Sequence, residues 1–241
     1  QSLYRAYRPK TFADVVGQEQ VTVPLRESIK AKKVGHAYLF AGSRGLGKTS
    51  VARIFAQELG TSDRDLYEID AASNNGVDEI RSLTEQVYTL PFNSTFKVYI
   101  LDEAHMLSKG AWNAFLKTLE EPPAHAIFIL ATTELEKVPE TVRSRCQVFE
   151  FRKPSREVLT THVASVAKKE GYTLEPAGAD LIGMLADGSY RDALSVLEKV
   201  LASATDKKLS LVEVEQATGA PKHALVHALV SALSGGDTEA A

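Results

Sequence analysis

The sequence predicts an α/β fold in which a doubly wound, parallel five-stranded sheet is followed by a small all-helical domain. Over roughly the first 150 residues, short apolar runs alternate with helix-periodic segments, as in chains whose crossover helices cover both faces of a parallel sheet. The run Lys97–Leu101 is almost continuously apolar, as expected of a strand buried on both faces. Beyond Pro154 only helical periodicity remains, and no strand is expected there.

The elements of the first domain, residues 1–152, follow from these patterns. Strands are expected at Ala37–Ala41, Asp65–Asp70, Lys97–Leu101, Ala126–Ala131 and Gln147–Phe151. Helices are expected where apolar residues recur every three or four positions: Gln18–Lys32, Val51–Leu59, Val77–Leu90, Lys109–Glu120 and a short one carrying Ser144–Cys146.

Residues 153–205 are assigned to the helical domain. Its helices are expected at Glu157–Glu170, Ala177–Ala186 and Tyr190–Ala204, with glycines at the breaks between them. Residues 206–241 are assigned to the start of a further helical domain or a tail, with short helices at Leu211–Thr218 and Lys222–Leu233.

Composition limits the classes of function. The 241 residues are 44% hydrophobic and 24% charged, which is ordinary for a folded soluble protein. No apolar run reaches the roughly 18 residues of a membrane span, and the N-terminus lacks the apolar core of a secretion signal. The single cysteine, Cys146, excludes an internal disulfide and fits a reducing cytoplasm. A net charge of −3 means that any nucleic-acid contact must come from a local patch.

A glycine-rich segment after the first strand matches the phosphate-loop pattern G-x-x-x-x-G-K-[ST]. The flanking strand and helix favour this interpretation over an ordinary turn. Glycines let consecutive N–H groups point at phosphate oxygens, Lys48 can reach the β- and γ-phosphates, and the Thr49 hydroxyl can bind Mg²⁺. The candidate nucleotide-binding residues here are Gly42, Gly45, Leu46, Gly47, Lys48, Thr49 and Ser50.

Two further strands end in polar residues that should meet this loop, because the carboxyl ends of parallel strands lie at one edge of the sheet. Asp102 can hold Mg²⁺ through water beside Thr49, and Glu103 can orient the water that attacks the γ-phosphate. Thr133 could donate a hydrogen bond to the γ-phosphate or to that water. The less favoured alternative is a threonine that caps a turn.

The residues alone leave two arginines open between a solvated charge and a phosphate contact. Arg145 precedes Cys146 beyond the site and could reach a neighbouring subunit's nucleotide as an arginine finger. Arg191 begins a helix, where a cation is poorly placed for local reasons, and this position suggests a phosphate partner.

The N-terminal segment also has two interpretations. It could cover a nucleotide base, with Val15 and Val16 against the ring and the backbone of Tyr7, Arg8 and Pro9 at its edge. It could instead be a strap over the core. Cys146 and the six histidines form no metal-ligand spacing, so no metal other than nucleotide-linked Mg²⁺ is expected.

In combination, these segments resemble the AAA+ ATPases of the clamp-loader group, and within it the gamma/tau subunits of bacterial DNA polymerase III. The resemblance covers about residues 4–205, and the matching segments are Tyr7–Gln18, Gly42–Ser50, Glu68–Ser73, Leu101–Leu107, Leu116–Pro123, Leu130–Thr133, Ser144–Cys146 and Gly188–Leu194.

The resemblance implies a role for each matching residue. Lys48 and Thr49 match the Walker A motif, and Asp102 and Glu103 match Walker B. Thr133 matches sensor 1 and Arg191 matches sensor 2. Arg145 matches the arginine finger that acts in trans. It also implies ATP or ADP with Mg²⁺, bound between subunits of a five-membered ring that opens a sliding clamp and loads it on primer-template DNA.

The implied partners are the other clamp-loader subunits, the sliding clamp, the backbone of primer-template DNA and, in the full-length form, the polymerase, with no membrane. Arg81 is the best local candidate for a DNA contact, although a solvated helix face explains it as well. Little chain follows Ala204, so the collar domain that holds the ring together is absent or only begun, which is compatible with a monomer.

One departure concerns zinc. The family usually carries a four-cysteine zinc module between the helix ending near Leu59 and the next strand, whereas Glu58–Asp63 has no cysteine. Either the module is lost or it is missing from this sequence, and no zinc is predicted.

The sequence disfavours two other functions. A catalytically silent scaffold subunit is disfavoured by the intact phosphate loop. A branch-migration helicase type of AAA+ motor is disfavoured by Ser144–Cys146 and Lys117–Pro123.

Overall fold

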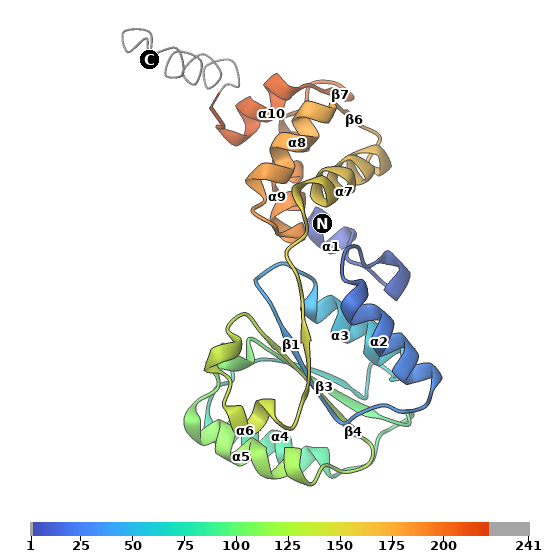
Figure 1. Ribbon diagram of the computed structural model, residues 1–241, viewed down its shortest axis with the longest axis vertical. Helices are drawn as coiled ribbons and strands as arrows, with labels where there is room; N and C mark the ends of the chain where they lie inside the picture. Colours follow the sequence, from blue (N-terminus) through green and yellow to red (C-terminus); the bar gives the residue numbers. More distant parts are fainter. Residues whose placement is uncertain (1, 222–241) are drawn as a thin grey trace. The chain divides into compact units, whose positions relative to one another are not determined.

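A computed structural model describes residues 2–221 and divides the chain into two compact units (Figure 1). The first is Arg8–Lys153. The second joins the N-terminal residues through Tyr7 to the chain from Pro154 onward. Among the described residues, no helix is both long and apolar enough to cross a membrane.

The first unit is built on a parallel sheet with strand order β2-β3-β4-β1-β5. The strands are β1 (Ala37–Ala41), β2 (Leu66–Asp70), β3 (Lys97–Asp102), β4 (Ala126–Thr132) and β5 (Gln147–Glu150). Because β4 lies between β1 and β3, its carboxyl end separates the loop after β1 from the acidic pair after β3. The predicted α/β fold with a parallel five-stranded sheet is therefore confirmed.

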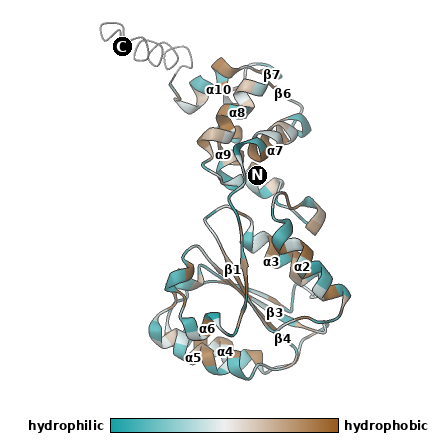
Figure 2. Cartoon of the chain, viewed as in Figure 1, coloured by the Kyte–Doolittle hydropathy of each residue, from teal (hydrophilic) through white to brown (hydrophobic). Residues whose placement is uncertain are grey.

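Helices cover both faces of this sheet, because side chains along each buried strand alternate between two cores. One face, with Tyr38, Phe40 and Ile100, packs against α2 (Glu19–Lys30) and α3 (Lys48–Glu58). The other, with Tyr99 and Phe128, packs against α4 (Val77–Val87) and α5 (Lys109–Glu120). The strands form the hydrophobic centre of the unit (Figure 2). The short elements are η1 (Phe12–Asp14), η2 (Ala104–Met106), η3 (Leu135–Lys137) and α6 (Glu140–Arg143).

The second unit is mainly helical and has its own core. Its helices are α1 (Leu3–Ala6), α7 (Arg156–Lys169), α8 (Pro176–Leu185), α9 (Tyr190–Ser203) and α10 (Leu211–Thr218). The buried core includes Leu3, Val163, Ile182, Leu197 and Val214. The first residues of the chain thus pack with helices that follow more than 150 residues later.

Two expectations about elements were wrong. The helical unit does contain strands: β6 (Thr173–Leu174) pairs in parallel with β7 (Lys208–Leu209), and runs of two residues are too short to produce a periodic pattern. The short helix predicted to carry Ser144–Cys146 instead ends at Arg143. The chain continues in a turn, in which the Arg145 N–H donates to the Val142 carbonyl.

The segment predicted as 206–241 is described only in part. Leu209 and Val214 pack in the same core as α8 and α9, so the residues up to 221 join the helical unit. The helix predicted at Lys222–Leu233 lies outside the described residues. The domain boundaries at 152 and 205 remain proposals.

Candidate functional site

The glycine-rich loop connects β1 to α3, and the need for glycine is clear at Gly42 and Gly47. Gly42 has φ +147°, and a Cβ there would lie 2.8 Å from the Phe151 carbonyl oxygen. Gly47 has φ +95°, which side-chain-bearing residues rarely adopt. The loop therefore turns directly into α3, whose first residue is Lys48.

The Lys48 side chain lies inside this loop. Lys48 is 6% exposed, and its Nζ donates to the carbonyl oxygens of Gly42 at 2.6 Å and Ser43 at 2.9 Å. Burial lowers the pKa of the Lys48 ammonium, while the nearby Glu103 and Asp102 carboxylates act in the opposite direction. A cation beside the start of a helix is the arrangement that a polyphosphate needs.

Thr49 and Asp102 meet across the edge of the sheet. The Thr49 hydroxyl, in the first turn of α3, donates to Asp102 Oδ2 at 2.7 Å. A hydroxyl and a carboxylate fit Mg²⁺, which binds through one or two carboxylates, substrate phosphates and water. No cluster of three or more His, Cys, Asp or Glu suited to a metal occurs within the described residues.

Glu103 and Thr133 also lie together at this edge. The Thr133 hydroxyl donates to Glu103 Oε2 at 3.1 Å, and the Glu103 N–H donates to Asp102 Oδ1 at 3.0 Å. Glu103 has φ +50°, a left-handed conformation that is uncommon outside glycine. The structure thus brings Lys48, Thr49, Asp102, Glu103 and Thr133 into one region, although they come from three separate segments.

Sequence reasoning missed two side chains at this region. His105 is buried and lies near Glu103, Thr132 and Glu134. Its place in Asp-Glu-Ala-His, directly after the acidic pair, was the available signal. The other is the side chain of Arg8, whose Nε donates to Ser50 Oγ at 2.8 Å. The sequence pattern assigns a role only to the backbone of Arg8.

The remaining residues of the predicted base contact lie in different environments and in both units. Val15 packs against the core on the α2 and α3 face, whereas Val16 is 41% exposed. Pro9 is half-buried, and Tyr7 belongs to the helical unit, where its hydroxyl donates to Glu170. The role of this segment at a base remains a prediction.

Of the three other predicted arginines, two contact residues outside this cluster and one belongs to the other unit. Arg145 donates to the Thr141 carbonyl at 2.5 Å and to Glu120 Oε1 at 2.6 Å, so its guanidinium contacts its own chain. Arg81 forms only an exposed 3.4 Å pair with Asp78. Arg191 belongs to the helical unit, where its guanidinium lies 4.6 Å from the centre of the Tyr4 ring. The roles of all three remain predictions.

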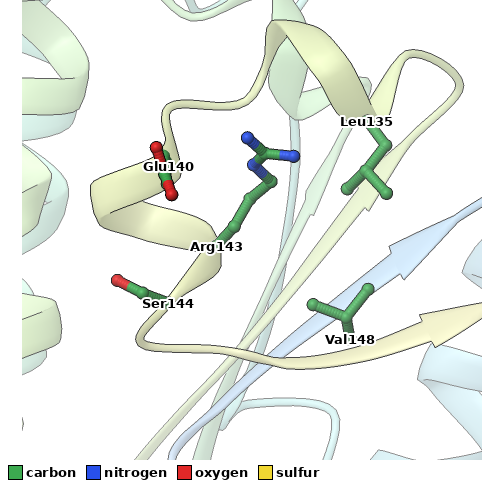
Figure 3. A pocket seen from close by; sticks show the side chains of 5 residues that line it. All are labelled: Leu135, Glu140, Arg143, Ser144 and Val148. Carbon is green, nitrogen blue, oxygen red and sulfur yellow. The ribbon is translucent and has the colours of Figure 1, made fainter.

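A pocket of about 350 Å³ lies beside the turn that carries Arg145. Leu135 and Val148 give it apolar walls, and Arg143 extends between Glu140 and Leu135 (Figure 3). The Nε of Arg143 is buried without a hydrogen-bond partner. None of the five lining residues belongs to the predicted nucleotide site.

Two family models match the chain. The model described as "DNA polymerase III, delta subunit" matches residues 17–75 and 61–155, which together exceed half of the chain. The model described as "DNA polymerase III clamp loader subunit, ATPase lid domain" matches residues 158–206. The chain belongs to the family of DNA polymerase III clamp-loader subunits.

Curated relatives of this clamp-loader family agree. DNA polymerase III subunit tau of Bacillus subtilis is 44% identical over 97% of this chain and 45% of its own length. Subunit gamma/tau of Mycobacterium bovis is 40% identical over 99% of this chain and 45% of its own length. The tau subunit of Escherichia coli is 42% identical over 84% of this chain and 35% of its own length. The chain therefore spans less than half the length of these relatives.

Solved structures confirm the AAA+ fold of this clamp-loader chain. The RuvB Holliday junction branch migration motor of Thermotoga maritima aligns with a TM-score of 0.75 over 88% of this chain and 72% of that protein. Because the two are only 23% identical, this likeness shows the fold and nothing of the function.

Proposed function

We propose that the chain binds and hydrolyses ATP as the motor subunit of a DNA polymerase III clamp loader. The observation that carries the proposal is the 2.7 Å hydrogen bond between Thr49 and Asp102, which joins the phosphate loop to the acidic pair. Family membership supports it, because the family models include a clamp-loader ATPase lid.

In this proposal each side chain has a separate task. Lys48 stabilises negative charge on the β- and γ-phosphates, and Glu103 orients the water and accepts its proton as oxygen attacks the γ-phosphorus and the bond to ADP breaks. Thr133 holds Glu103 through its hydroxyl. Thr49 and Asp102 would hold Mg²⁺, which neutralises phosphate charge when bound. Arg191, Arg8 and Ser50 are assigned to nucleotide binding, and Arg145 to a neighbour's nucleotide.

The proposed partners are those of the family: further clamp-loader subunits, a sliding clamp and the backbone of primer-template DNA, in the cytoplasm. Arg81 is the proposed DNA contact. A catalytically silent scaffold would not need the buried lysine, the hydroxyl and both carboxylates in one region.

The test is an ATPase assay on the full-length protein, assembled with its partner subunits. We expect hydrolysis that rises when sliding clamp and primed DNA are both added. Nucleotide binding without hydrolysis would favour the scaffold function. Hydrolysis that four-way junction DNA stimulates and the clamp does not would favour a branch-migration motor.

A further inference from the structure

His105 has an environment that the proposed function does not yet explain. It lies in η2, and its side chain is 6% exposed. Its Nδ1 is 3.0 Å from the Thr132 hydroxyl and 3.5 Å from Glu103 Oε2, and its Nε2 is 3.3 Å from Glu134 Oε1. A buried polar ring therefore lies between two carboxylates.

These contacts connect three segments of the α/β unit. Thr132 is the last residue of β4, and its hydroxyl also accepts the Glu134 N–H at 3.0 Å. Glu134 is paired in turn with Lys137 at 2.6 Å. The imidazole therefore links the residue after β3 to the end of β4 and to η3.

The direction of the Glu103 side chain depends on contacts with neighbouring side chains of this kind. Its left-handed backbone, with φ +50°, lies outside regular secondary structure, so no helix or strand neighbour fixes its direction. The same oxygen, Oε2, that accepts from Thr133 faces the His105 ring. Two side chains, His105 in η2 and Thr133 directly after β4, thus approach Glu103 at one atom.

We propose that His105 is a positioning residue that holds the Glu103 carboxylate in the direction that hydrolysis requires. This inference rests on the proposed ATPase function and deepens it. In this proposal His105 acts through Glu103 and has no role in binding the nucleotide. Its removal should therefore lower kcat and leave nucleotide affinity almost unchanged.

The experiment compares His105→Leu with wild type in the assembled complex. We expect kcat to fall about 10- to 100-fold, as for other partners that orient a functional group, with the ATP Kd within about 3-fold of wild type. His105→Gln, which keeps a polar group, should recover part of the loss. His125→Leu is the matched control, because His125 contacts the Val87 carbonyl and not this site, and its kcat should be unchanged.

A double-mutant cycle separates positioning from a general loss of structure. In the Glu103→Gln background, His105→Leu should cause no further loss of single-turnover rate. A loss as large as in wild type would overturn the inference while leaving the proposed function intact. An equal loss of nucleotide affinity would also overturn it. A wild-type complex that does not hydrolyse ATP would overturn the proposed function itself, and this inference with it.

Discussion

Asp65 illustrates how one buried charge can organise a surface loop. It has no exposed surface, and its carboxylate accepts the N–H groups of Phe92, Asn93 and Ser94 and the hydroxyl of Ser62. Burial alone would raise the pKa of Asp65, but these hydrogen bonds outweigh it and hold the pKa well below the usual range. The carboxylate therefore fixes the loop between α4 and β3.

We predict that Asp65→Asn lowers the free energy of unfolding at pH 7 by about 1–3 kcal/mol. Because the folded pKa is depressed, the stability from ionised Asp65 is complete above the unfolded pKa of about 4 and is lost as pH falls through the lower folded value. The difference between variant and wild type should thus shrink below about pH 4 in urea titrations. Asp63→Asn, at an exposed neighbour, should show no such difference. A constant difference down to acidic pH would contradict this account.

Lys48 is the residue on which nucleotide binding should depend most. We predict that Lys48→Ala abolishes detectable ATP binding in calorimetric titrations, because it removes the cation held in the loop. Lys30→Ala, at an exposed pair on α2, is the control and should bind normally. Unchanged affinity in Lys48→Ala would refute the assignment of the loop.

At the scale of elements, the phosphate loop depends on backbone geometry as much as on side chains. Gly42 leaves no room for a Cβ, because the Phe151 backbone passes beside it. That contact links the start of the loop to the end of the sheet. A side chain there must move either the loop or the chain after β5.

We predict that Gly42→Ala weakens ATP binding at least 10-fold and also lowers thermal stability. Gly171→Ala is the control: its φ of +82° is also one that L residues rarely adopt, nothing lies within 4 Å of the added carbon, and it belongs to the helical unit. It should lower stability and leave ATP affinity unchanged. Equal affinity losses in both variants would mean that strain alone, and not the loop, is responsible.

The three central strands, β1, β3 and β4, could be predicted because apolar runs of five to seven residues are distinctive when both faces are buried. The edge strands β2 and β5 are partly exposed and mix apolar with polar residues, so their pattern is weaker. The position of the site could be predicted because the carboxyl ends of parallel strands lie at one edge of the sheet. The β6–β7 pair could not be predicted, since two residues carry no period. His105 was missed because its partners, Thr132 and Glu134, belong to a separate segment at the end of β4. Their contact with His105 follows from the pairing of β3 with β4.

At the scale of the whole molecule, the helical unit is completed by the beginning of the chain. Leu3 is 8% exposed in its core, its N–H donates to Glu198 Oε2 at 3.2 Å, and Tyr4 lies against Arg191. The N-terminal residues are therefore a structural part of this unit.

We predict that Leu3→Ala destabilises the helical unit by about 1–3 kcal/mol. Hydrogen exchange should accelerate in α9 and remain unchanged in β3 and β4. Leu90→Ala, at a side chain that is 78% exposed, is the control and should change neither. Faster exchange throughout the sheet would contradict the division into units.

The proposed role of Arg145 can be tested only in the assembled complex, because it concerns a neighbouring subunit's nucleotide. We predict that Arg145→Ala slows ATP hydrolysis by roughly 10³-fold or more in assembled rings. The isolated chain should lose little ATPase activity. The exposed pair of Arg145 with Glu120 contributes at most about 1 kcal/mol to stability, so its loss should not unfold the chain. Arg143→Ala is the neighbouring control. Equal losses in the isolated chain and the ring would exclude a finger role.

The long-range contact between Leu3 and Glu198 has a consequence for synthesis on the ribosome. Their separation of 195 positions corresponds to roughly 10–40 s of translation, so α1 emerges long before its binding surface exists. The α/β unit can fold in that interval. The residues of α1 then leave the exit tunnel well before those of α9 and are among the last of the described residues to reach their native place.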